Sequence, residues 1–101
     1  MRIIIALQPT NKRGTKSAYT NFRKKLLSDG FMLVMPEVFM RITSNRKSAK
    51  IHINRISDYL PDTGVIRALL LTEKQYQNII YLVGEADYQE KMVGGNCHIS
   101  L

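Results

Sequence analysis

The sequence predicts one α+β domain, in which a small β-sheet carries two helices. Three observations support this fold class. Apolar segments typical of strands alternate with two segments that have helical spacing. Gly and Pro residues, which favour turns, stand at most of the junctions between these segments. Apolar residues make up 45% of the 101 residues, which is enough for one modest hydrophobic core.

The first strand is expected at residues 2–7, which contain a continuous apolar run. A run without polar positions indicates a strand that is buried on both faces. It is too short to span a membrane, which needs roughly 20 apolar residues, so we expect no membrane partner. Residues 8–15 form a loop, because Pro9 and Gly14 interrupt regular structure.

The spacing of apolar residues predicts a helix over residues 16–29, with a left-handed cap at Gly30. Its buried stripe contains Ala18, Tyr19, Phe22, Leu26 and Leu27. Arg23, Lys24 and Lys25 lie near the C-terminal end of this helix, where the helix dipole favours cations. These three charges therefore have a structural explanation, and we do not assign them to a binding site.

Two strands, at residues 31–35 and 37–43, are expected to meet at a sharp bend, because Pro36 cannot belong to the interior of a sheet. Ser44 or Asn45 then caps a second helix that extends to about residue 59, before Pro61. One face of this helix contains Ala49, His52, Ile53, Ile56 and Tyr59. We interpret His52 as a packed or partly exposed residue and not as a metal ligand.

The remaining elements are a strand at residues 64–71, a short helical turn at 72–77, a further strand at 78–83, a polar segment at 84–95, and an edge strand or tail at 97–101. The sequence thus predicts a single domain over residues 1–101. Residues 1–83 form its core, and 84–101 form a C-terminal loop followed by a strand or tail.

The order of these elements is β-α-β-β-α-β with an extra C-terminal strand, which is the ferredoxin-like arrangement. Both helices then cover one face of a four-stranded antiparallel sheet. The other face would expose an apolar patch too large for a monomer. We therefore expect a homodimer that packs sheet against sheet, with the C-terminal strand free to add to the edge of the partner's sheet.

The net charge of +7 is concentrated in one half of the chain. Residues 1–60 contain twelve Lys and Arg against three Asp and Glu, a balance of +9. Residues 61–101 contain three Lys and Arg against five Asp and Glu, a balance of −2. A concentrated positive charge favours a polyanionic partner, such as nucleic acid or an anionic membrane surface.

Cysteine and histidine are too few for a disulfide or a zinc site. Cys97 is the only cysteine, and His52 and His98 are the only histidines. A single thiol excludes an intrachain disulfide and is consistent with a reducing, cytoplasmic location. We interpret Cys97 as an inert thiol of the C-terminal tail.

Three blocks of sequence resemble the CRISPR-associated Cas2 family, in the variant that accompanies Cas9-type systems. They are R-I-I-I-A-L-Q-P-T at residues 2–10, S-A-Y-T-N-F-R-K-K-L-L-S-D-G-F at 17–31 and T-E-K-Q-Y-Q-N-I-I-Y-L-V-G-E at 72–85. Their order and spacing make the match specific, whereas no single block would suffice. The fold of this family is a ferredoxin-like dimer.

The resemblance implies a role in the acquisition of CRISPR spacers. In such a complex, a central Cas2 dimer bridges two dimers of the Cas1 integrase, and the assembly holds a short DNA duplex, the prespacer. Cas1 carries out the transesterification, while Cas2 spaces the two active sites and contributes basic residues to the DNA backbone. The expected partners are a second copy of the chain, the integrase and double-stranded DNA.

The sequence departs from the family at the end of the first strand. Many members have an aspartate there, and the two aspartates of a dimer are proposed to hold a divalent metal such as Mg²⁺ for nuclease activity. The matching residue here is Leu7, which cannot bind a metal, and the following Gln8 offers one neutral oxygen. No acidic residue precedes Asp29. We therefore expect no metal cofactor and no metal-dependent nuclease activity.

Binding to phosphates requires exposed Lys and Arg residues and little else. The candidates form two sets, with Lys12, Arg13 and Lys16 around the first loop and Arg46, Lys47 and Lys50 at the start of the second helix. Arg41 and Arg67 lie inside strands, and we expect them to pair with Glu37 or other acids. Most aromatic residues fall on core-facing positions, which favours contact with the backbone of a duplex over base stacking.

Two other kinds of function remain open. The first is a metal-dependent endonuclease or endoribonuclease, either of the same family or of the VapD toxin type, which shares the ferredoxin-like dimer. Such an enzyme needs a general base or metal-binding carboxylates. The second is a ferredoxin-like RNA-binding module, which needs exposed aromatic residues on the face of its sheet.

Overall fold

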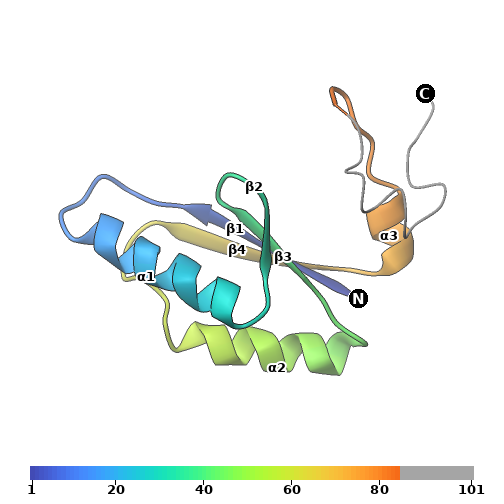
Figure 1. The fold of residues 1–101 in the computed structure, drawn as a ribbon, viewed down its shortest axis with the longest axis horizontal. Coiled ribbons are helices and arrows are strands. Elements are labelled where there is room, and N and C mark those ends of the chain that lie inside the picture. The colour runs from blue at the N-terminus through green and yellow to red at the C-terminus, as the bar shows by residue number, and fades with distance from the viewer. Residues whose placement is uncertain (85–101) are drawn as a thin grey trace. The chain divides into compact units, whose positions relative to one another are not determined.

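The computed structural model describes residues 1–84, and the chain divides into two compact units at Leu71. Figure 1 shows the elements, which are β1 (Arg2–Gln8), α1 (Thr15–Ser28), β2 (Met32–Met35), β3 (Val38–Ile42), α2 (Arg46–Ser57), β4 (Val65–Leu71) and α3 (Glu73–Gln77). Each element predicted before residue 78 is confirmed, with ends that differ by at most two residues.

The four strands form one sheet in the order β2-β3-β1-β4. β3 lies between β1 and β2 and pairs antiparallel with both. Both α1 and α2 lie on the same side of this sheet (Figure 1). The molecule is therefore an α+β protein whose topology is compatible with the ferredoxin-like arrangement that the order of elements predicts.

The hydrophobic core lies between the sheet and the two helices. Successive side chains of a strand point to opposite faces, so alternate residues of β1 face the helices. Ile3, Ile5 and Leu7 do so, and each is at most 6% exposed. The helices contribute residues at helical spacing that pack against them, namely Tyr19, Phe22 and Leu26 of α1 and Ala49 and Ile56 of α2.

The other face of the sheet is mostly apolar and much of it is exposed within residues 1–84, although Met40 is only 3% exposed. Two cations, Arg2 of β1 and Arg67 of β4, also lie on this face, since they alternate with the core-facing residues. We call it the open sheet face; its residues alternate with the core-facing ones and include Ile4, Ala6, Met32, Met35, Val38, Met40, Ile42, Val65 and Leu69. Ile42 and Leu69 are 59% and 56% exposed. The prediction that β1 is buried on both faces is thus wrong for one chain, since only the helix side is covered.

The hairpin between β2 and β3 turns at Pro36 and Glu37, as the proline predicts. Glu37 has a positive φ of 65°, which only glycine adopts at little cost. Its carboxylate accepts two hydrogen bonds of 2.7 Å from Arg23 of α1, and its carbonyl accepts a 2.8 Å bond from Leu7. The expectation that Arg41 and Arg67 pair with Glu37 or other acids is wrong within residues 1–84, since neither forms an ion pair there and Arg41 donates to the backbone carbonyl of Asp29.

Two apolar residues assigned to the helix stripes are exposed instead. Leu27 is 54% exposed, because it lies beside and not within the stripe formed by Tyr19, Phe22 and Leu26. Tyr59 is 53% exposed, because α2 ends at Ser57 and Tyr59 no longer follows the helical stripe. The ammonium group of Lys25 lies 4.4 Å from the centre of the Tyr59 ring.

The predicted strand at residues 78–83 is not found. Instead, Asn78 and Ile79 add a turn to the end of α3. Their N–H groups each donate a 3.2 Å hydrogen bond to a carbonyl of that helix. A strand needs a neighbour for its N–H and C=O groups, and within residues 1–84 this segment has none. Leu82 and Val83 are 87% and 94% exposed. The predictions for residues 85–101, including Cys97, lie outside the described residues.

Candidate nucleic-acid interface

The first set of candidate residues lies where β1 leads into α1. We call residues 9–14 the β1–α1 loop. Lys12 and Arg13 of this loop and Lys16 of α1 are all exposed. Gly14 has a φ of 84°, so it turns the chain into the helix in a conformation that favours glycine. No side chain caps α1, which leaves N–H groups of its first turn directed towards the loop.

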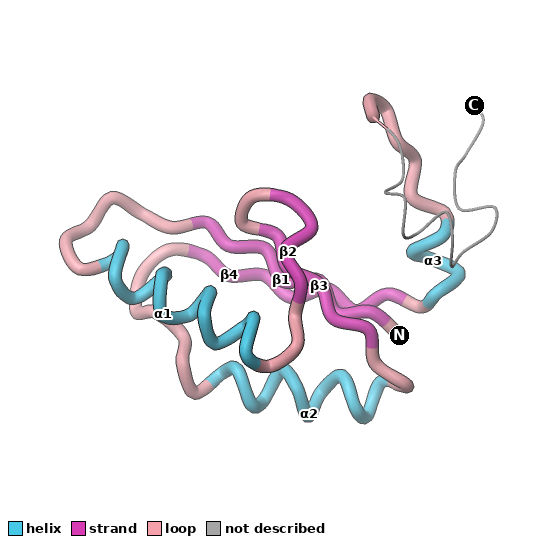
Figure 2. The backbone as a smooth tube through the Cα atoms, viewed as in Figure 1, coloured by secondary structure: helices cyan, strands magenta, loops and turns pink. Residues whose placement is uncertain are grey.

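A group of hydroxyls lies beneath this loop. The Oγ1 of Thr63, in the connection between α2 and β4, lies 2.9 Å from the Oγ1 of Thr15 and 3.4 Å from that of Thr10. The hydroxyl of Tyr19 donates a 2.6 Å hydrogen bond to the carbonyl of Thr63. A Cβ on Gly64 would lie 2.6 Å from the carbonyl of Gln8, so only glycine fits here. Figure 2 shows both connections at the same end of the sheet.

The second set of candidate residues lies at the start of α2. Arg46, Lys47 and Lys50 are exposed in the first turns of this helix. The side chain of Asn45 accepts a 2.8 Å hydrogen bond from the N–H of Ser48, which confirms Asn45 as the N-cap.

The two sets lie at opposite ends of the helical layer. Arg2 at the start of β1 pairs with Ile42 at the end of β3, so α2 begins beside the start of β1. The β1–α1 loop follows the other end of β1. A single chain therefore presents two separate basic clusters, one at each end (Figure 1).

Within their bounds, the two helices carry positive charge only, and the nearest acids, Asp29 and Asp58, are the residues that directly follow them. α1 and α2 contain eight Lys and Arg residues and no Asp or Glu. Within residues 1–84, none of the six candidate side chains forms an ion pair. Several of them lie at helix N-termini, where the helix dipole disfavours cations. Helix stability therefore does not explain these charges.

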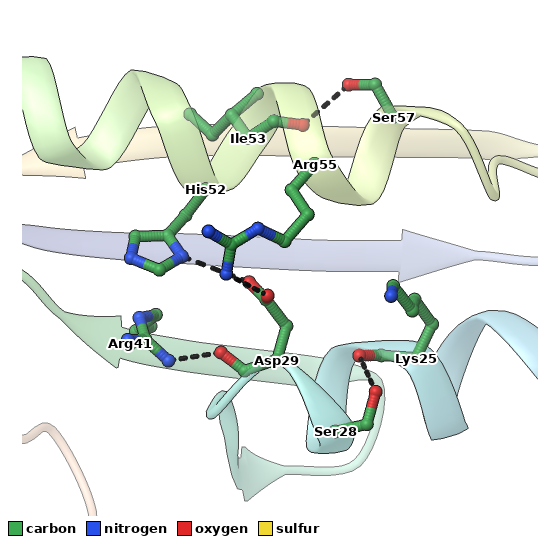
Figure 3. A network of polar contacts seen from close by, with 8 residues as sticks. All are labelled: Lys25, Ser28, Asp29, Arg41, His52, Ile53, Arg55 and Ser57. Carbon is green, nitrogen blue, oxygen red and sulfur yellow. Dashed lines mark hydrogen bonds and ion pairs between the residues drawn. The ribbon is translucent and has the colours of Figure 1, made fainter.

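Other charged residues of the helical layer have structural roles (Figure 3). The buried carboxylate of Asp29, at the end of α1, lies 2.9 Å from the guanidinium of Arg55 and 3.1 Å from Nδ1 of His52. Arg41 of β3 donates to the Asp29 carbonyl. Burial alone raises the pKa of Asp29, but the hydrogen bonds from Arg55 and His52 outweigh it and hold the pKa below its usual value. His52 is packed and partly exposed, as the sequence indicates.

Arg23 and Glu37 form a second structural pair. The hydrogen bonds from Arg23 lower the pKa of Glu37, although partial burial opposes this effect. The same hydrogen bonds raise the pKa of Arg23. Arg23 thus joins α1 to the β2–β3 hairpin, which agrees with its exclusion from the binding residues.

The end of β1 does not offer ligands for a divalent metal. Leu7 is 6% exposed, belongs to the core and faces the helices. Gln8 is the exposed residue here, and its uncharged amide replaces the carboxylates that Mg²⁺ prefers. Within the described part of the chain, no three His, Cys, Asp or Glu side chains form a group that could hold a metal ion.

Sequence reasoning missed the residues that support the interface. The hydrogen-bond partners of Thr63 are 44 to 53 positions away in the chain. The side-chain partners of Asp29 are 23 and 26 positions away. Threonine next to glycine in a turn gives no signal of such contacts. Tyr59, which was assigned to the core-facing stripe, is an exposed aromatic residue at the end of α2 and not on the sheet face.

The fold and its charges define a class: a small α+β protein with a basic helical layer and an apolar open sheet face. No helix in residues 1–84 is long and apolar enough to cross a membrane. No family model matches the chain. It is, however, similar to three proteins named CRISPR-associated endoribonuclease Cas2, from Ligilactobacillus salivarius, Acidovorax ebreus and Streptococcus mutans.

The identities to these relatives are 37%, 36% and 38%, in the same order. The matches cover 84%, 92% and 86% of this chain and 85%, 92% and 81% of the relatives. At this identity and coverage, the chain belongs to the CRISPR-associated Cas2 family, as the three sequence blocks indicate.

Proposed function

We propose that this protein is a non-catalytic, DNA-binding subunit of the complex that acquires CRISPR spacers. In this proposal a homodimer bridges dimers of the Cas1 integrase in the cytoplasm and holds the prespacer duplex. The observation that carries the proposal is that α1 and α2 contain no acids and that the six exposed candidate cations have no ion-pair partner within residues 1–84. Such charges bind phosphates by releasing the counterions of DNA.

A homodimer would change both surfaces of the chain. It would cover the open sheet face, whose apolar residues are costly to leave in water. It would also repeat the basic clusters by two-fold symmetry, so that one duplex meets clusters from both chains. The apolar residues 79–83, which have no strand neighbour within residues 1–84, are then available to pair with the partner's sheet edge.

The binding test compares two triple variants. Lys12→Ala/Arg13→Ala/Lys16→Ala removes the cluster at the β1–α1 loop, and Arg46→Ala/Lys47→Ala/Lys50→Ala removes the cluster at α2. Each should weaken binding to a DNA duplex and reduce the slope of log affinity against log salt by up to about three. The control is Lys74→Ala, which removes a charge of α3, outside the two basic helices. Equal slopes in all variants would show that these surfaces do not contact DNA.

The names of the relatives favour a second candidate, an endoribonuclease. Its test is incubation of highly purified protein with labelled RNA and DNA in Mg²⁺ or Mn²⁺. We expect no cleavage, because the end of β1 supplies Leu7 and Gln8 where carboxylates would be needed. Asp62, an exposed acid beside Thr63, provides the decisive control. Cleavage that is lost in Asp62→Asn would establish the enzyme and refute the non-catalytic proposal.

A further inference from the structure

Thr63 connects both ends of the β1–α1 loop to the rest of the domain. Its hydroxyl meets the hydroxyl of Thr15, where α1 begins, and that of Thr10, near the start of the loop. Its carbonyl accepts the hydroxyl of Tyr19, a side chain with no exposed surface. Thr63 is therefore itself held in place by the core.

The loop has few other restraints. Within residues 1–84, its remaining hydrogen bonds are local, from the N–H of Thr15 to the carbonyl of Lys12 and from that of Ala18 to the carbonyl of Gly14. All residues from 9 to 14 are exposed. Packing against the core therefore does not fix the loop, and the hydroxyl contacts of Thr63 are what joins it to another element.

We propose that Thr63 is a positioning residue for DNA binding. It carries no charge, and it acts by holding Lys12 and Arg13 in one arrangement before the duplex arrives. A loop without these contacts would have to lose conformational freedom when its side chains settle on phosphates, which weakens binding. This inference rests on the proposed function, because it requires that the loop contacts DNA.

The main variant is Thr63→Val, which removes the hydroxyl and nearly preserves the shape of the side chain. We expect its affinity for duplex DNA to fall about fivefold, the effect of one or two hydrogen bonds. The salt slope should stay unchanged, since no phosphate-binding charge is lost. Thr63→Ser should restore the affinity. The matched control is Thr20→Val, because the Thr20 hydroxyl donates only to Lys16 within α1.

Amide hydrogen exchange provides a readout that a purely structural role would not move. In Thr63→Val, the amides of Thr15 and Ala18, which donate to the loop carbonyls of Lys12 and Gly14, should exchange faster while the later turns of α1 keep their protection. Thr15→Val removes the other member of the closest hydroxyl pair and also serves if Thr63→Val fails to fold. The double variant should bind no more weakly than Thr63→Val, because both changes remove the same contact.

The outcomes separate the inference from the function on which it rests. If the Lys12/Arg13/Lys16 triple variant binds weakly while Thr63→Val and Thr15→Val bind like the native protein, the positioning role is refuted and the proposed function stands. If the Lys12/Arg13/Lys16 variant also binds like the native protein, the positioning role is refuted, because the loop then does not contact DNA. The proposed function falls with it only if the Arg46/Lys47/Lys50 variant binds like the native protein as well. Additive losses in the double variant would refute the shared hydroxyl contact.

Discussion

Glu37 shows how one side chain compensates for an unfavourable backbone. It is the non-glycine residue with positive φ in residues 1–84, at 65°, a conformation that costs about 1 kcal/mol. Its two hydrogen bonds with Arg23 stabilise the folded state by a similar amount, about 0.5–1 kcal/mol. The contribution is no larger because the pair is about one-third exposed and partly screened by water. The two effects nearly cancel at this position.

This balance gives a prediction for two substitutions. Glu37→Gln keeps the strained backbone and loses the charged pair, so the free energy of unfolding should fall by about 1 kcal/mol. Glu37→Gly loses the pair but relieves the backbone, so it should be nearly neutral. Urea unfolding at pH 7 measures both. A glycine variant that is clearly less stable than the glutamine variant would contradict the account.

Asp29 and Glu37 also predict how stability depends on pH. Both carboxyls have a folded pKa below the ordinary value, so their contribution is present above the unfolded pKa of about 4. It is lost as the pH falls through the folded pKa values, since the protonated carboxyl no longer attracts its cations. We expect the free energy of unfolding to decrease below about pH 4. Asp29→Asn should be less stable at pH 7 and show a shallower decrease in acid, measured by urea unfolding at several pH values.

The contacts of Asp29 and Thr63 could not be predicted from the sequence, whereas the exposure of single charged residues could. Charge and exposure of Lys12 or Arg46 follow from local sequence, because a charged side chain in a loop or first helical turn stays in water. The partner of a buried polar group depends instead on which distant segments the fold brings together. The sequence therefore identified candidate phosphate-binding residues but not the hydroxyls beneath them.

Among the elements, those with a strong local signal were predicted well. Apolar periodicity, together with Gly30, Pro36 and Asn45, fixed the ends of α1, the β2–β3 hairpin and the start of α2 to within two residues. Residues 78–83 have equally strong apolar character, yet form no strand in the described chain. A helix satisfies its own backbone, whereas a strand depends on a neighbour that local sequence does not reveal.

The N-cap of α2 gives a prediction at the scale of the element. Asn45→Ala removes the 2.8 Å hydrogen bond to the N–H of Ser48 and should lower the free energy of unfolding by about 1 kcal/mol. Asn54→Ala is the matched control, because Asn54 is exposed within the same helix, where alanine is favoured. Thermal unfolding followed by circular dichroism compares the two. Equal melting temperatures would show that the cap contributes little.

The whole molecule has two contrasting surfaces. α1 and α2 contain eight Lys and Arg residues and no Asp or Glu, and the open sheet face is mostly apolar and largely exposed within residues 1–84. This contrast separates the two proposed partners, with DNA on the charged side and a second copy of the chain on the apolar side. The separation makes it possible to disturb either surface without the other.

The final prediction concerns the proposed homodimer. Leu69 lies on the open sheet face, while its neighbour Leu70 packs against the core, so Leu69→Asp should leave the fold of one chain intact. A charge buried in an apolar interface without a partner is strongly unfavourable, so this variant should be monomeric in sedimentation equilibrium. Ile51→Asp is the matched control, because Ile51 is 51% exposed on α2 and should leave the dimer unchanged. If native protein and both variants sediment as monomers, the open sheet face is not a dimer interface, and the two-fold arrangement of the basic clusters fails with it.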